Sequence, residues 1–141
     1  MENLKSEITV FKPEELSNFH FREDWKMNIC QAHPYFHINK IEDVIHYLKF
    51  PVPPHKKTLF DFIFLTKGSS KRCKGLNEYE FSKNTFFFLP ALQITSCEYI
   101  TSDAQGYFCH FDFQIFNELF AKQSFLEDIV FLQHYGEPLF V

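Results

Sequence analysis

The sequence has no dense tract of lysine and arginine. Its formal net charge is −4, whereas a nucleic-acid-binding domain normally carries a basic stripe that neutralises phosphates. The most basic segment, residues 67–74, contains no interleaved aromatic residues, so we interpret it as a solvated hairpin. The chain itself is therefore not expected to bind DNA.

A long apolar run is also missing. Residues 1–5 are polar, unlike the apolar segment of a signal peptide. No stretch approaches the roughly 18 apolar residues that a membrane-spanning helix needs. We therefore expect a cytoplasmic protein that has no membrane partner.

Paired cysteines are absent as well. Four cysteines are scattered along the chain without a C-x-x-C pair, at Cys30, Cys73, Cys97 and Cys109. This spacing is typical of reduced thiols in a cytoplasmic protein, and a secreted disulfide framework is the alternative. We interpret Cys97 and Cys109 as buried thiols, because free cysteine usually behaves as a small hydrophobic residue.

Aromatic residues, in contrast, are abundant. They make up 19% of the 141 residues, and 20 of them are phenylalanine. A chain of this length fits one domain with an ordinary core, and a high aromatic share favours strands. Short apolar runs between turn residues predict strands at residues 8–11, 36–38, 58–66, 78–81, 85–89, 93–100 and 107–113.

Two segments have helical rather than alternating periodicity. Apolar residues from Ile41 to Leu48 recur at helical spacing, with Asn39 as the expected N-cap. Beyond Asp112 a second helical stretch begins, in which three phenylalanines share one face: Phe113, Phe116 and Phe120. The pattern as a whole predicts a mainly β sandwich or barrel with helical appendages.

Two spaced motifs resemble those of cupin barrels. Cupins carry G-x5-H-x-H-x3-4-E-x6-G followed by G-x5-P-x-G-x2-H-x3-N. This chain has His55-x-Lys57-x3-Asp61-x6-Gly68, and then Asn84-x5-Pro90-x-Leu92-x2-Thr95-x3-Tyr99. The resemblance implies a cupin-like double-stranded β-helix, that is, a jelly-roll barrel with C-terminal α-helices.

The same resemblance places four residues where a metal-binding cupin has its ligands: His55, Lys57, Asp61 and Thr95. A protonated lysine cannot bind a cation, and a threonine hydroxyl is a poor ligand for transition metals. One histidine and one carboxylate do not make a site with three protein ligands. We therefore expect no metal, no other cofactor and no catalytic residues, which argues against a cupin dioxygenase.

A wider pattern is similar to the N-terminal domain of AraC-type transcription regulators, especially those of the Bacteroidetes lineage. It consists of the proline-rich run before His55, the strand to Gly68, and the segments Phe86–Pro90 and Gly106–Phe108. This resemblance covers residues 35–141. It implies an arm with a first strand at residues 1–34, a barrel core at 35–112, and helices at 113–141. It also implies that these helices lead towards a helix-turn-helix domain, and we expect that this domain has been trimmed from the chain.

The resemblance also implies what the domain does. A small-molecule effector, for example a sugar, would bind inside the barrel, and the helical stretch would form a homodimer through Phe113, Phe116 and Phe120. DNA would be bound only through the absent helix-turn-helix domain. The alternatives are a stand-alone cupin isomerase or oxygenase, a carbohydrate-binding jelly roll, and a helix that merely covers the barrel.

The candidate effector-binding residues are the four at the ancestral ligand positions, His55, Lys57, Asp61 and Thr95. The alternative for them is an ion pair between Lys57 and Asp61, or a pocket filled by phenylalanine rings. Weaker pocket candidates are Leu59 and Ile63, which share the parity of Asp61, and His110, for which a core position is the alternative. His33 and His37 flank Pro34, so we place both on the surface or in the arm.

Overall fold

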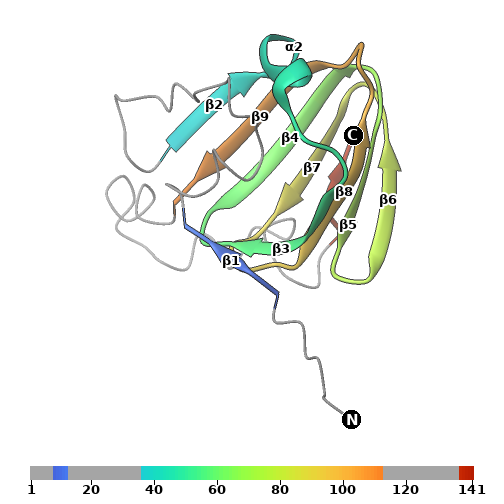
Figure 1. The fold of residues 1–141 in the computed structure, drawn as a ribbon. Helices are drawn as coiled ribbons and strands as arrows, with labels where there is room; N and C mark the ends of the chain where they lie inside the picture. The colour runs from blue at the N-terminus through green and yellow to red at the C-terminus, as the bar shows by residue number, and fades with distance from the viewer. Residues whose placement is uncertain (1–7, 13–35, 113–136) are drawn as a thin grey trace, which may run out of the picture.

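The strands of the chain form two five-stranded sheets that face each other (Figure 1). The computed structural model describes residues 8–12, 36–112 and 137–141. The first sheet has the order β1 (Val10–Phe11), β3 (Val52–Lys57), β8 (Thr95–Ile100), β5 (Ser70–Lys74) and β6 (Asn77–Phe81). The second has the order β10 (Leu139–Phe140), β7 (Thr85–Leu89), β4 (Phe60–Lys67), β9 (Gln105–Phe111) and β2 (Phe36–Lys40).

The strand order is that of a jelly roll. From β2 to β9 the chain alternates between the sheets, except at the β5–β6 hairpin, and every pair within these eight strands is antiparallel. Double-sheet jelly rolls of eight strands have this architecture. The prediction of a mainly β, cupin-like jelly roll is confirmed. The C-terminal helices, together with Phe113, Phe116 and Phe120, lie outside the described residues.

Most predicted strands are present, but the first predicted helix is wrong in its length and its cap. α2 (Ile41–Val44) is a single turn and continues into the 3-10 turn η1 (Ile45–Tyr47). Asn39 lies in β2 opposite Phe108 of β9, so it cannot cap the helix, and Lys40 at the N-cap makes no side-chain cap hydrogen bond. In the described residues, no helix is long and apolar enough to cross a membrane.

β4 sends alternate side chains into the space between the sheets. Asp61, Ile63 and Leu65 are buried, whereas Phe60, Phe62 and Phe64 on the other face are only partly buried. The nearly continuous apolar run of this strand predicts burial on both faces, but the structure buries the face towards the interior more deeply than the other. Leu65 and Ile63 belong to an apolar cluster that fills one part of the interior, with Ile41, Ile45, Phe81, Phe87, Leu89 and Ala104.

Three turn positions that match cupin glycines have left-handed backbones. Gly68 has φ +84°, and a Cβ there would lie 2.6 Å from Thr101 Oγ1 and 2.7 Å from Ala104 Cα. Asn84 and Leu92 stand where the second motif has glycine, and each has φ +63°. The turns of the two motifs therefore keep a glycine-like backbone even where the glycine itself is replaced.

Candidate ligand-binding cavity

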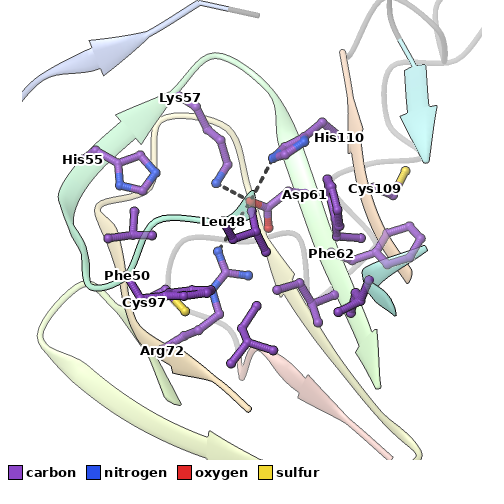
Figure 2. A pocket seen from close by; sticks show the side chains of 15 residues that line it. Leu48, Phe50, His55, Lys57, Asp61, Phe62, Arg72, Cys97, Cys109 and His110 are labelled. Carbon is purple, nitrogen blue, oxygen red and sulfur yellow. Dashed lines mark ion pairs between the residues drawn. The ribbon is translucent and has the colours of Figure 1, made fainter. Parts of the chain in front are cut away.

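A cavity of about 70 Å³ lies between the two sheets, beside the apolar cluster (Figure 2). A water needs roughly 15 Å³ of such space, so the cavity has room for several waters or a small organic group. Its lining is mostly apolar and includes a few polar side chains. The lining residues are Ile41, Leu48, Phe50, Val52, His55, Lys57, Asp61, Phe62, Ile63, Arg72, Cys97, Ile100, Phe108, Cys109 and His110.

Five of the seven predicted pocket residues line this cavity: His55, Lys57, Asp61, Ile63 and His110. Leu59 and Thr95 are buried but are not part of the lining. The Thr95 hydroxyl donates a 2.8 Å hydrogen bond to the Cys73 carbonyl and so ties β8 to β5. Whether any of these residues binds an effector remains a prediction.

Lys57 and Asp61 form a buried ion pair at the centre of the polar lining. Lys57 is the last residue of β3 and Asp61 is the second residue of β4. The short connection between these strands, which belong to different sheets, therefore brings the two side chains together. Burial lowers the pKa of Lys57, and the Asp61 carboxylate opposes that shift. The arrangement is the ion pair that the sequence left as an alternative, and it does not exclude ligand contact because both residues line the cavity.

Of the lining residues that the sequence did not predict, Arg72 is the charged one. The interpretation of residues 67–74 as a solvated hairpin is wrong for Arg72 and Lys74, which are buried at 6% and 5% exposure. On β5 the side chains of Ser70, Arg72 and Lys74 point to the buried face, whereas Lys71 and Cys73 alternate to the other side. Alternation places Arg72 on the same face as Ser70 and Lys74, but no apolar residue marks that face as the buried one, so the sequence contains no clear signal for Arg72.

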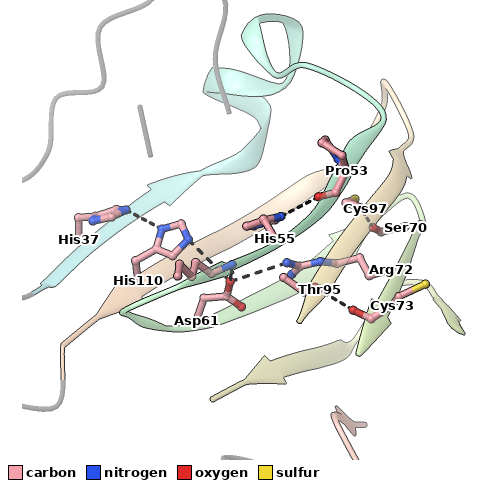
Figure 3. A network of polar contacts seen from close by, with 11 residues as sticks. His37, Pro53, His55, Asp61, Ser70, Arg72, Cys73, Thr95, Cys97 and His110 are labelled. Carbon is pink, nitrogen blue, oxygen red and sulfur yellow. Dashed lines mark hydrogen bonds and ion pairs between the residues drawn. The ribbon is translucent and has the colours of Figure 1, made fainter. Parts of the chain in front are cut away.

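Asp61 also faces the Arg72 guanidinium and the His110 imidazole (Figure 3). Its Oδ2 lies 3.7 Å from Arg72 Nη2 and 3.7 Å from His110 Nε2. Asp61 and His110 are paired in register between β4 and β9, and His110 is paired with His37 of β2. Three polar side chains therefore form one row across the second sheet.

The position of His37 contradicts its assignment to the surface or the arm. It is buried at 6% exposure, and its Nε2 lies 2.8 Å from His110 Nδ1. One ring donates this hydrogen bond and the other accepts it. Burial lowers the pKa of His37 to about 4 and that of His110 well below its ordinary value. Both rings are therefore neutral at pH 7.

His55 is fixed on the opposite wall. Its Nδ1–H donates a 2.8 Å hydrogen bond to the Pro53 carbonyl, because a carbonyl oxygen can only accept. The Phe11 ring of β1 packs edge-on against the imidazole at 5.9 Å between centroids. Burial and, secondarily, the Lys57 charge lower the pKa of His55 to about 4, so this ring is neutral as well.

The buried-thiol interpretation is confirmed for Cys97 and Cys109, which are buried and free, and Cys73 is also free. Among the described residues there is no group of three or more His, Cys, Asp or Glu side chains that could hold a metal ion. At the ancestral ligand positions, Lys57 is engaged by Asp61 and Thr95 by a carbonyl. These residues do not fit the metal of a cupin enzyme.

No protein-family model and no curated protein matches the chain. One similar solved structure is a "putative mannose-6-phosphate isomerase" from Ralstonia eutropha JMP134. It is 11% identical, with a TM-score of 0.44, and the match covers 79% of this chain and 97% of that one. Similarity at this level says nothing about activity, and the jelly-roll assignment rests on the strand order.

Proposed function

We propose that this chain is the effector-sensing domain of an AraC-type transcription regulator and binds a small molecule between its two sheets. The observation that carries the proposal is the cavity itself, which has apolar walls and a few convergent polar groups. Binding sites for small molecules have this composition. The residues at the cupin metal positions do not fit a metal, and this supports sensing over metal-dependent catalysis.

The cavity is in contact with segments that could report its occupancy. Ile41 of α2 and Leu48 after η1 line it, and both lie between β2 and β3. β1 pairs in parallel with the end of β3, with Phe11 opposite Lys57. An effector that favours one arrangement of these segments would shift the population towards it.

A matched pair of variants tests whether ligands bind in this cavity. Ile100→Trp would fill it from β8, whereas Leu76→Trp changes a fully exposed residue of the β5–β6 turn. In a thermal-shift and calorimetric screen of small metabolites, we expect a hit that Leu76→Trp keeps and Ile100→Trp loses. A ligand at 100 times its dissociation constant stabilises the fold by roughly 2.7 kcal/mol. A hit that Ile100→Trp keeps would place binding elsewhere.

The regulatory part of the proposal has a separate test. The reading frame beyond Val141 is expected to encode a pair of helix-turn-helix units. The full-length product should bind a promoter fragment with an affinity that changes when the effector is added. A product without a DNA-binding domain would contradict the regulatory role and leave the binding role intact.

An acid–base enzyme, such as an isomerase, is the second candidate, because an imidazole that can transfer a proton, that of His110, lines the cavity. His110 is supported on one side by His37 and faces Asp61 on the other. Such an enzyme would convert a bound metabolite, whereas a sensor would return it unchanged. Nuclear magnetic resonance of ligand incubated with protein, with His110→Gln as control, separates the two.

A further inference from the structure

Arg72 is held in the cavity wall by interactions that leave much of its guanidinium unused. The group lies over the Phe87 ring at 5.1 Å from the centroid, and its Nη2 is 3.7 Å from Asp61 Oδ2. That separation is an ion pair rather than a hydrogen bond. Figure 2 shows the guanidinium beside the lining residues Phe50 and Cys97.

The remaining donors of Arg72 have no acceptor among the described residues. Nε and Nη1 are buried and make no hydrogen bond there, although together they carry three of the five N–H donors of a guanidinium. Arginine stays protonated in proteins, so it cannot avoid the cost of burial by losing its charge. Buried donors that are left unsatisfied in this way indicate that the hydrogen-bond acceptor comes from outside the described residues.

The charges around the cavity indicate the sign of that acceptor. Of the described lining residues, Lys57 and Arg72 are cationic groups and Asp61 is a carboxylate. His55 and His110 are neutral at pH 7, because burial lowers the pKa of each, and burial raises the pKa of the Cys97 thiol. The described lining therefore carries one positive charge in excess, which a bound monoanion would neutralise.

The rest of the lining indicates what the anion is attached to. Apolar side chains make most of the wall, among them Val52, Ile63, Ile100 and Phe108. A small space of about 70 Å³ with such walls fits a short hydrocarbon group better than a polyhydroxylated sugar. A phosphate with two charges would exceed the single positive excess.

We propose that the ligand of this cavity is a small monocarboxylate with an apolar body, whose carboxylate accepts hydrogen bonds from Arg72 while its body packs on the aliphatic wall. Guanidinium–carboxylate hydrogen bonds are charge-assisted and directional, and they would use the buried donors. This inference rests on the proposed binding function and replaces the expectation of a sugar.

The test compares each carboxylate with its neutral amide of the same shape. Straight and branched monocarboxylates of two to eight carbons, benzoate, the corresponding amides, and a set of neutral sugars are titrated into the full chain by calorimetry at constant ionic strength. We expect at least one acid to bind 10-fold or more tightly than its amide. If amides or sugars bind as well as the acids, the cavity binds ligands but the anion inference is overturned. If nothing in the panel, including sugars and acids, binds, both proposals fail.

A spectroscopic signal locates the carboxylate without any variant at Arg72. The chain has only two arginines, Arg22 and Arg72, so its Arg Nε–H region contains two resonances, and Arg22→Lys identifies them. The preferred acid should move the Arg72 resonance downfield at saturation. A resonance that stays in place while the acid binds would overturn the assignment of Arg72.

Substitution of Arg72 gives a third test of its role in binding the carboxylate. Arg72→Met keeps an unbranched apolar stem and removes the guanidinium, and it should reduce the preference for acid over amide at least 10-fold while the folded state is retained. Arg72→Lys keeps the charge but not the planar fork, and should fall between the two. If Arg72→Met binds the acid as tightly as the original chain, the proposal is wrong.

Discussion

The interior of this jelly roll has an apolar part and a charged part, and one strand supplies both. β4 contributes Leu65 to the apolar cluster and Asp61 to the ion pairs, with Ile63 between them. In the apolar part, burial stabilises the fold by roughly 25 cal/mol for each Å² of apolar surface that is removed from water. In the charged part, burial removes water from Lys57 and Arg72, whose ion pairs do not reliably compensate that cost. Burial in the apolar part therefore stabilises the fold, whereas the uncompensated cost in the charged part is what the proposed ligand site would require.

Acid should have the largest effect, and we expect it to act through the buried histidines beside the charged part. The folded-state pKa values of His37 and His55 are about 4, below the unfolded value near 6.5. The unfolded chain therefore takes up protons first, so stability is complete above about pH 7 and is lost as the pH falls from 6.5 towards 4. At pH 5 we expect a loss of about 4 kcal/mol from these two residues, measured by urea unfolding, with His110 adding to it.

His37→Gln removes one of the titrating groups, so it should reduce the loss of unfolding free energy between pH 7 and pH 5. Leu65→Ala should instead leave the pH dependence unchanged, because its effect does not involve a proton. An unfolding free energy that does not change from pH 7 to pH 5 would contradict the buried, neutral state of the histidines.

Removal of the shared carboxylate should have an effect nearly as large. Asp61→Ala leaves Lys57 and Arg72 buried without their described counter-ion, and breaking a buried pair in this way costs about 4 kcal/mol. The matched control is Glu98→Ala, which breaks an ion pair with Lys71 on the surface and should cost about 0.5 kcal/mol. Equal losses in denaturant unfolding would show that the buried pair is no different from a surface pair.

A cavity in the apolar part should cost about 3 kcal/mol. Leu65 is fully buried, and Leu→Ala at such a site loses both transfer free energy and packing. Leu76→Ala on the exposed turn should change the unfolding free energy by less than about 0.5 kcal/mol. If Leu65→Ala were as mild as its control, the stabilising role of this part would be refuted.

A change at a turn should give the smallest effect, and in the opposite direction. Leu92 has φ +63° and is half exposed, so its side chain strains the backbone by about 1 kcal/mol or more and gains little from burial. Leu92→Gly should raise the unfolding free energy by about 0.5 kcal/mol, after the entropy cost of glycine. Leu76→Gly, at a residue without positive φ, should not stabilise.

The extent to which sequence predicted this molecule differs between the same two parts. Strand alternation and turn residues predict the sheets, and Thr85–Leu89 forms a strand with the predicted bounds. The buried state of Arg72 and His37 was not predicted, because a charged residue in a polar strand is usually solvent-exposed and only the partner strand determines which face is buried. His37 is buried because β2 pairs with β9 over 70 residues away, and that pairing has no local signature.

We propose that the charged part of the interior is present for ligand binding and not for stability. The variant Lys57→Met/Asp61→Leu/Arg72→Met replaces all three charged lining residues with apolar ones of similar size. Its unfolding free energy at pH 7, measured in urea without ligand, should equal or exceed that of the original chain, because the desolvation cost is removed. A loss of more than about 2 kcal/mol would show that the charged residues stabilise the fold, and it would contradict a role in binding alone.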